Sequence, residues 1–155
     1  MREYAFEESS ALAIPASQFW ADATLADVNA ELAPWVRMTA PAAWELVPLR
    51  QWPTGQCLFR SWVLLLGFLP VDLHAFYLQS IDPGRGFEER SSSVTNKRWE
   101  HSRAIASHNA GCLVVDSVRF ESRLPLVGAM LLPVYRAIFR SRHRYLRRKH
   151  GQPVG

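Results

Sequence analysis

The feature that most constrains this chain is the stretch 97–121, which reads KRWEHSRAIASHNAGCLVVDSVRFE. It predicts a β-hairpin, because residues 108–111 (HNAG) supply an Asn and a Gly, which tolerate the positive φ angles of a tight turn. Centring the hairpin on this turn fixes which residues face each other. One face then holds Trp99 opposite Phe120, His101 opposite Val118, Arg103 opposite Asp116 and Ile105 opposite Val114, and the other holds Arg98 opposite Glu121, Glu100 opposite Arg119 and Ser102 opposite Ser117.

This register places opposite charges across from each other on one face and apolar side chains on the other, as cross-strand pairing favours. The apolar face nevertheless carries Arg103 and Asp116, with His101 beside them. Charged side chains are rarely buried unless they are paired. The hairpin therefore predicts either a buried structural network of charges or the polar part of a cavity wall.

Length and composition indicate one globular domain over residues 1–155. A chain of 155 residues with 48% hydrophobic and 21% charged residues is long and apolar enough to bury a core. The N-terminus has no apolar signal segment, and the longest apolar run, 62–69, is shorter than a membrane span. We expect a soluble cytoplasmic protein. Cys57 and Cys112 lack the spacing of a metal or redox motif and are interpreted as buried thiols.

The predicted elements follow the order strand, two short helices, several strands and a long helix. A turn at Pro70 is expected to follow a strand that is apolar on both faces, and residues 94–96 are expected to form a tight connection. That connection pairs Glu89 with His101 and Arg90 with Glu100. Apart from the hairpin, we expect strands over residues 2–13, 44–50, 57–69, 73–81 and 86–93, short helices over 16–23 and after the N-cap Thr24, and a long helix over 125–149.

The long C-terminal helix has one apolar and one basic face at helical spacing. Arg142 falls within the apolar face. The basic face indicates a solvated surface or, alternatively, contact with an anionic membrane. We expect no nucleic-acid partner, because no aromatic residues alternate with these arginines. The apolar positions are Val127, Leu131, Val134, Tyr135, Ile138, Phe139, Tyr145 and Leu146, and the basic positions are Arg136, Arg140, Arg144 and Arg147.

These motifs resemble the START / polyketide-cyclase / birch-pollen-allergen (SRPBCC) superfamily, and in particular its small bacterial ligand-binding members. Such members often show a W-x-H strand, a G-C-x-x-x-D-x-V-x-F strand and a last helix ending F-x-x-R-H-x-x-L. Arg103 stands where a second His is usual. The matching residues are Trp99 and His101, then Gly111, Cys112, Asp116, Val118 and Phe120, then Phe139, Arg142, His143 and Leu146.

The resemblance implies an α+β helix-grip fold, in which a curved antiparallel β-sheet wraps around a long C-terminal helix, with two short helices after the first strand and a cavity beneath the helix. Three interpretations of the inward polar residues remain open. They form a structural network, they fix the polar end of a bound ligand, or they catalyse a cyclase, dehydratase or isomerase reaction with His101 or Glu89 as general base and Arg103 stabilising an oxyanion.

We predict binding of a hydrophobic or amphipathic small molecule, such as a lipid, polyketide or isoprenoid-like compound, in preference to catalysis. No catalytic residue, cofactor or metal site is assigned, because no nucleophile or metal-ligand spacing is present. His74 and His108 lie beside predicted turns and receive no role. The predicted ligand-binding residues are Trp99, His101, Arg103, Asp116, Phe120, Glu89, Tyr135 and Phe139, and Trp35, Met38 and Phe76 are expected near the pocket mouth.

Overall fold

The computed structural model describes residues 2–154. Seven antiparallel strands form a sheet in the order β1-β7-β6-β5-β4-β3-β2. The strands are β1 (Glu3–Leu12), β2 (Val36–Met38), β3 (Cys57–Leu65), β4 (Leu69–Asp82), β5 (Gly86–Ser93), β6 (Asn96–His108) and β7 (Gly111–Ser122). The helices are α1 (Leu25–Leu32), α2 (Ala42–Glu45) and α3 (Pro125–His150), and a 3-10 turn, η1 (Leu49–Gln51), follows α2.

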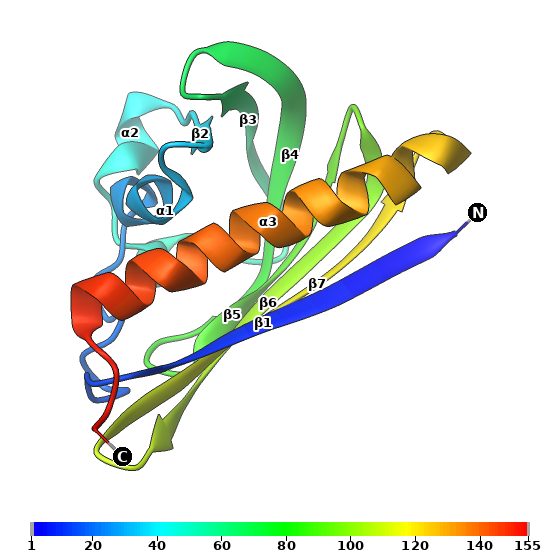
Figure 1. Ribbon diagram of the computed structural model, residues 1–155. Helices are drawn as coiled ribbons and strands as arrows, with labels where there is room; N and C mark the ends of the chain where they lie inside the picture. Colours follow the sequence, from blue (N-terminus) through cyan, green and yellow to red (C-terminus); the bar gives the residue numbers. More distant parts are fainter. Residues whose placement is uncertain (1, 155) are drawn as a thin grey trace.

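The sheet curves, and α3 runs diagonally across its concave face (Figure 1). The short helix α1 lies beside the C-terminal half of α3, and α2 lies next to α1. This arrangement confirms the predicted α+β helix-grip fold, with two short helices between the first strand and the rest of the sheet. None of the helices in the described part of the chain is long and apolar enough to cross a membrane.

The predicted register of the β6–β7 hairpin is confirmed for every pair, including Arg103 with Asp116. The neighbouring register is confirmed as well, because Glu89 pairs with His101 between β5 and β6. At the hairpin turn, Asn109 adopts the predicted positive φ of 51°. Gly111 does not, so its predicted contribution to the turn is wrong, and a different constraint acts on it.

Gly111 lies against the backbone of β1, where a Cβ atom would overlap the carbonyl oxygen of Leu12. We expect Gly111→Ala to lower the free energy of unfolding by about 1–3 kcal/mol, because two hydrogen-bonded strands would have to separate. Urea unfolding measures this change. The control is Ala110→Ser on the exposed turn, and an equal effect of both substitutions would contradict the explanation.

Two predictions in the first half of the chain are wrong. Residues 44–50 do not form a strand, because Pro41 and Pro48 sit at the N-caps of α2 and η1 and start helical turns there. Residues 16–23 form turns without a helix, because Trp20 adopts a left-handed φ of 62° that interrupts helical hydrogen bonding.

The β3–β4 connection also differs from the prediction. The turn lies at residues 66–68, where Leu66 and Gly67 have φ angles of 54° and 84°, so Pro70 falls inside β4. This hairpin extends beyond the helices (Figure 1), which leaves Trp62, for example, 49% exposed. Strand β3 is therefore only partly covered. The expectation that Cys57 is buried is wrong.

Helix α3 turns its apolar face to the sheet, while its basic face divides into two kinds of residue. Arg136 and Arg144 are exposed. Arg140 forms an ion pair with Glu8 on β1 at 3.1 Å. Arg147 donates a hydrogen bond to the Ser10 hydroxyl at 2.7 Å. Two of the four predicted basic residues, Arg140 and Arg147, therefore help to hold α3 against β1.

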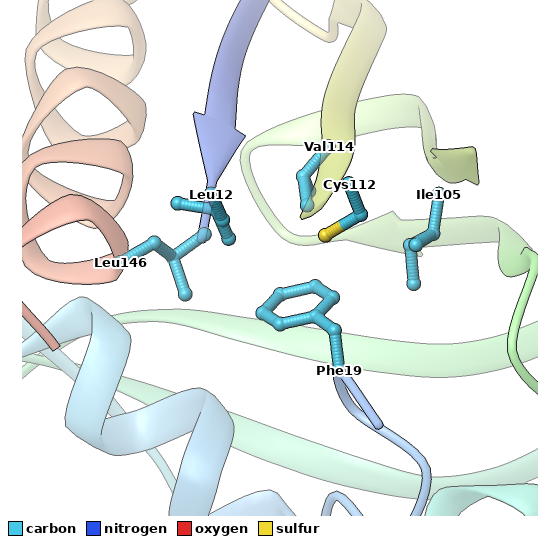
Figure 2. Packing of buried hydrophobic residues seen from close by; sticks show 6 residues of the cluster. All are labelled: Leu12, Phe19, Ile105, Cys112, Val114 and Leu146. Atoms are coloured by element: carbon cyan, nitrogen blue, oxygen red, sulfur yellow. The ribbon is translucent and has the colours of Figure 1, made fainter. Parts of the chain in front are cut away.

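A compact apolar cluster fills the space under the C-terminal end of α3 (Figure 2). Phe19 reaches it from the segment that follows β1, and Leu146 reaches it from α3. None of its buried members lines the cavity described below, so the open space lies under the preceding part of α3. The buried members are Leu12, Phe19, Ile105, Cys112, Val114 and Leu146.

Candidate functional site

A cavity of about 360 Å³ lies between the concave face of the sheet, α1 and α3. Its wall is mainly aliphatic and aromatic, and its size falls in the range of small-molecule sites, roughly 300–1,000 Å³. Strand β4 shows how the sequence builds this wall. Because side chains alternate along a strand, Asp72, His74, Phe76 and Leu78 all face the cavity.

The structure divides the predicted ligand-binding residues into two groups. Arg103, Asp116 and Phe120 do not line the cavity, and each is at most 1% exposed because the wall and the core cover it. Of the three residues expected at the mouth, Met38 and Phe76 line the cavity and Trp35 does not. The predicted residues that do line it are Glu89, Trp99, His101, Tyr135 and Phe139.

Arg103 is the centre of a buried ion-pair network behind the cavity wall. Its guanidinium donates to Asp116 through Nε and Nη2, at 2.9 and 2.7 Å. It also donates to Glu31 on α1 through Nη1 and Nη2, both at 2.9 Å. The indole of Trp20 lies 4.5 Å from the guanidinium carbon and donates its N–H to Glu31. Arg103 therefore joins the sheet to α1 through two bidentate pairs.

Arg142 explains why a charge occurs on the apolar face of α3. It donates to Glu31 Oε2 through Nη2 at 2.8 Å, and its guanidinium packs over the ring of Phe139. Glu31 thus accepts hydrogen bonds from two arginines that come from the sheet and from α3. Three separate elements meet at this one carboxylate.

Histidines extend the network at Asp116, which accepts hydrogen bonds from two imidazoles. The Nε2 atoms of His101 and His143 lie 2.9 and 2.8 Å from its oxygens. The Nδ1 of His143 lies 2.8 Å from the Ser10 hydroxyl on β1. His101 is different, because its Nδ1 points toward a second carboxylate, Glu89, at 3.7 Å.

Glu89 forms the end of the network that touches the cavity. Its Oε1 accepts hydrogen bonds from the Nε2 of His74 at 2.6 Å and from the hydroxyl of Ser91 at 2.7 Å. His74 is buried within β4 and lines the cavity, so its predicted position beside a turn is wrong. The period-2 pattern of β4, which sets His74 on the same side as Phe76, is the signal that pointed to it.

Partner charges keep the carboxyl groups of the network ionised. Burial alone would raise their pKa values, but the Arg103 guanidinium lowers the pKa of Asp116 and, together with Arg142, that of Glu31. The imidazoles of His101 and His74 lower the pKa of Glu89. Burial alone would lower the pKa of Arg103, yet the two facing carboxylates raise it. The network is therefore a set of paired charges with a structural role.

Sequence reasoning missed Glu31, the carboxylate that joins the two arginines. One signal could have indicated it, since Arg103 and Arg142 both occupy apolar faces and require more carboxylate than Asp116 provides. No group of three or more His, Cys, Asp or Glu side chains within residues 2–154 has an arrangement that could hold a metal ion.

A protein-family model described as a domain of unknown function (DUF8410) matches residues 10–150. No curated protein matches this chain significantly.

Three solved structures share the architecture at low sequence identity. The Zhui aromatase/cyclase from Streptomyces sp. R1128 is 14% identical, with a TM-score of 0.67 over 96% of this chain and 94% of that one. Ara h 8.0201 is 16% identical, with a TM-score of 0.56 over 94% and 98%. A START superfamily protein from Mycobacterium smegmatis is 9% identical, with a TM-score of 0.57 over 96% of both chains.

Proposed function

This chain belongs to the DUF8410 family and has the fold of the START / polyketide-cyclase / birch-pollen-allergen (SRPBCC) superfamily, and we propose that it binds a hydrophobic or amphipathic small molecule beneath α3. The observation that carries this proposal is the cavity of about 360 Å³ with its largely apolar wall. Burial of apolar ligand surface in such a space is favourable by roughly 25 cal/mol per Å² before the costs of association. A lipid, a polyketide or an isoprenoid-like compound has this character.

The contacts of His101 and Glu89 favour binding over the alternative, a cyclase, dehydratase or isomerase that uses one of them as general base. His101 directs Nε2 at Asp116 and Nδ1 toward Glu89, so both of its nitrogens face carboxylates. The lowered pKa of Glu89 makes it a weak base, since an efficient general base has a pKa near the working pH.

The proposal predicts that protein purified from its own host carries a small molecule. Native mass spectrometry of the purified protein, compared with the mass after denaturation, detects it. An apolar compound released on denaturation supports the proposal. The absence of any such compound, together with failure to bind the naphthalene probes described below, would overturn it.

Filling the cavity is expected to weaken ligand binding without unfolding the protein. Ile138 on α3 lines the cavity and its neighbour Ala137 is exposed, so Ile138→Trp and Ala137→Trp form a matched pair. We expect Ile138→Trp to weaken binding of 1-methylnaphthalene at least about tenfold, because the indole occupies the ligand's space. Titration calorimetry measures binding, and thermal unfolding checks that both variants are folded. Equal affinities for the two variants would place the ligand elsewhere.

A further inference from the structure

His74 occupies the junction between the polar and apolar parts of the cavity wall. Along β4, Asp72 and His74 face the cavity at one end of the row, and Phe76 and Leu78 continue it as an apolar surface. The imidazole is fixed in place, because its Nε2 is bonded to Glu89 and its ring packs edge-on against Trp99 at 6.2 Å between centroids. A buried, immobilised imidazole in the wall of an apolar cavity is suited to a specific polar contact.

The second nitrogen of this imidazole remains available. Nδ1 of His74 makes no hydrogen bond with any of residues 2–154, whereas Nε2 is fully used. Within the same residues, the one buried side-chain nitrogen or oxygen atom without a partner is Asn96 Oδ1. Nδ1 is therefore not enclosed by protein, and the open space that His74 lines is the cavity.

The bond to Glu89 also determines what Nδ1 offers to a ligand. Glu89 is ionised, so it accepts the hydrogen bond and the Nε2 atom of His74 carries the proton. In the neutral imidazole the other nitrogen then carries a lone pair. In its neutral form, His74 thus presents a hydrogen-bond acceptor to the cavity through Nδ1.

Tyr135 provides a complementary group on the opposite wall. Its ring packs edge-on against the same indole, that of Trp99, at 5.1 Å between centroids. Its hydroxyl accepts a hydrogen bond from Asn96 Nδ2 at 2.8 Å, which leaves the hydroxyl proton free to be donated. Burial raises the pKa of Tyr135, so the hydroxyl keeps that proton. An acceptor and a donor therefore flank one aromatic side chain of the cavity.

We propose that His74, held by Glu89, accepts a hydrogen bond from a hydroxyl group of the bound molecule, which makes the ligand class apolar alcohols or phenols. Tyr135 donates to the oxygen of the same hydroxyl, which matches the ability of a hydroxyl group to donate and accept at once. This inference rests on the proposed ligand-binding function and specifies it. An apolar molecule without such a group leaves Nδ1 desolvated and unpaired, which disfavours its binding.

Two probes of the same shape separate this inference from simple apolar binding. We would titrate 1-naphthol and 1-methylnaphthalene, which differ in a hydroxyl and a methyl group, into the wild type, His74→Phe and His108→Phe. His108 is exposed at the hairpin turn and provides the matched control. We expect His74→Phe to lower the ratio of naphthol to methylnaphthalene affinity about tenfold, which corresponds to about 1.4 kcal/mol. His108→Phe should leave the ratio unchanged.

If both probes bind and the ratio of naphthol to methylnaphthalene affinity is the same in the wild type and His74→Phe, the inference is overturned while the proposed function stands. Failure of both probes to bind the wild type would overturn the inference and count against the proposed function. Should His74→Phe not fold, the wild type alone decides by nitrogen-15 NMR. Bound 1-naphthol should shift the Nδ1 resonance of His74 and bound 1-methylnaphthalene should not, and equal responses would contradict the role of His74.

Discussion

Replacing Arg103 with methionine is expected to lower the free energy of unfolding by about 3–5 kcal/mol, the usual effect of removing one partner from a buried ion pair. Arg103 is 1% exposed and neutralises both Asp116 and Glu31. Without it, two ionised carboxylates remain in the interior, Asp116 beside two histidines and Glu31 beside Arg142 and the Trp20 N–H. Methionine keeps the apolar part of the side chain, so the decrease in the free energy of unfolding reports the removal of the charged guanidinium. Urea unfolding gives the value.

The control for this substitution is Arg119→Met on β7. Arg119 is exposed, and we expect its replacement to change the free energy of unfolding by no more than about 0.5 kcal/mol. We expect Arg103→Lys to lower the free energy of unfolding by an amount between those for Arg119→Met and Arg103→Met. Lysine keeps the charge, but an ammonium group cannot form the two bidentate contacts of a guanidinium. A loss below about 1 kcal/mol for Arg103→Met would show that the network contributes little, contrary to the structure.

Acidification is expected to produce the second large effect, a steep loss of stability below about pH 4.5, the ordinary pKa of Glu. The folded-state pKa values of Glu31, Glu89 and Asp116 lie below their ordinary values. As pH falls, the unfolded chain therefore takes up protons that the folded chain does not, and stability decreases. Each carboxyl group contributes at most about 1.4 kcal/mol per pH unit, reached where the pH lies below its ordinary pKa and above its folded-state pKa. The three together therefore give at most about 4 kcal/mol per unit, below the ordinary Asp pKa of 3.8. Urea unfolding at successive pH values measures the slope.

A matched pair on β5 tests the origin of this slope. Glu89 is buried in the network, and Glu88 is exposed beside it. We expect Glu89→Gln to reduce the slope below pH 4.5 by about one carboxyl group's share, and Glu88→Gln to leave it unchanged. A slope that is insensitive to Glu89→Gln would place the acid sensitivity outside the network.

The candidate site could be predicted from the sequence only in part, and the reason is the range of the contacts involved. Arg103 and Asp116 face each other across one hairpin, so local alternation places them together. Glu31 lies 72 positions before Arg103 on a different element, and no periodicity links the two. The predicted turn at Pro70 places His74 beside a loop, whereas the turn in the structure lies at residues 66–68 and His74 lies within β4.

The sequence by itself determined the hairpin register, the sheet that continues from it and the long amphipathic helix, because turn residues and side-chain alternation act between near neighbours. Only the tertiary structure decided that Arg103, Asp116 and Phe120 lie behind the cavity wall, while His74 and Glu89 reach it. That division depends on how closely α1 and α3 pack against the concave face of the sheet. Contacts between segments far apart in the sequence set this packing distance, and no local sequence pattern encodes it.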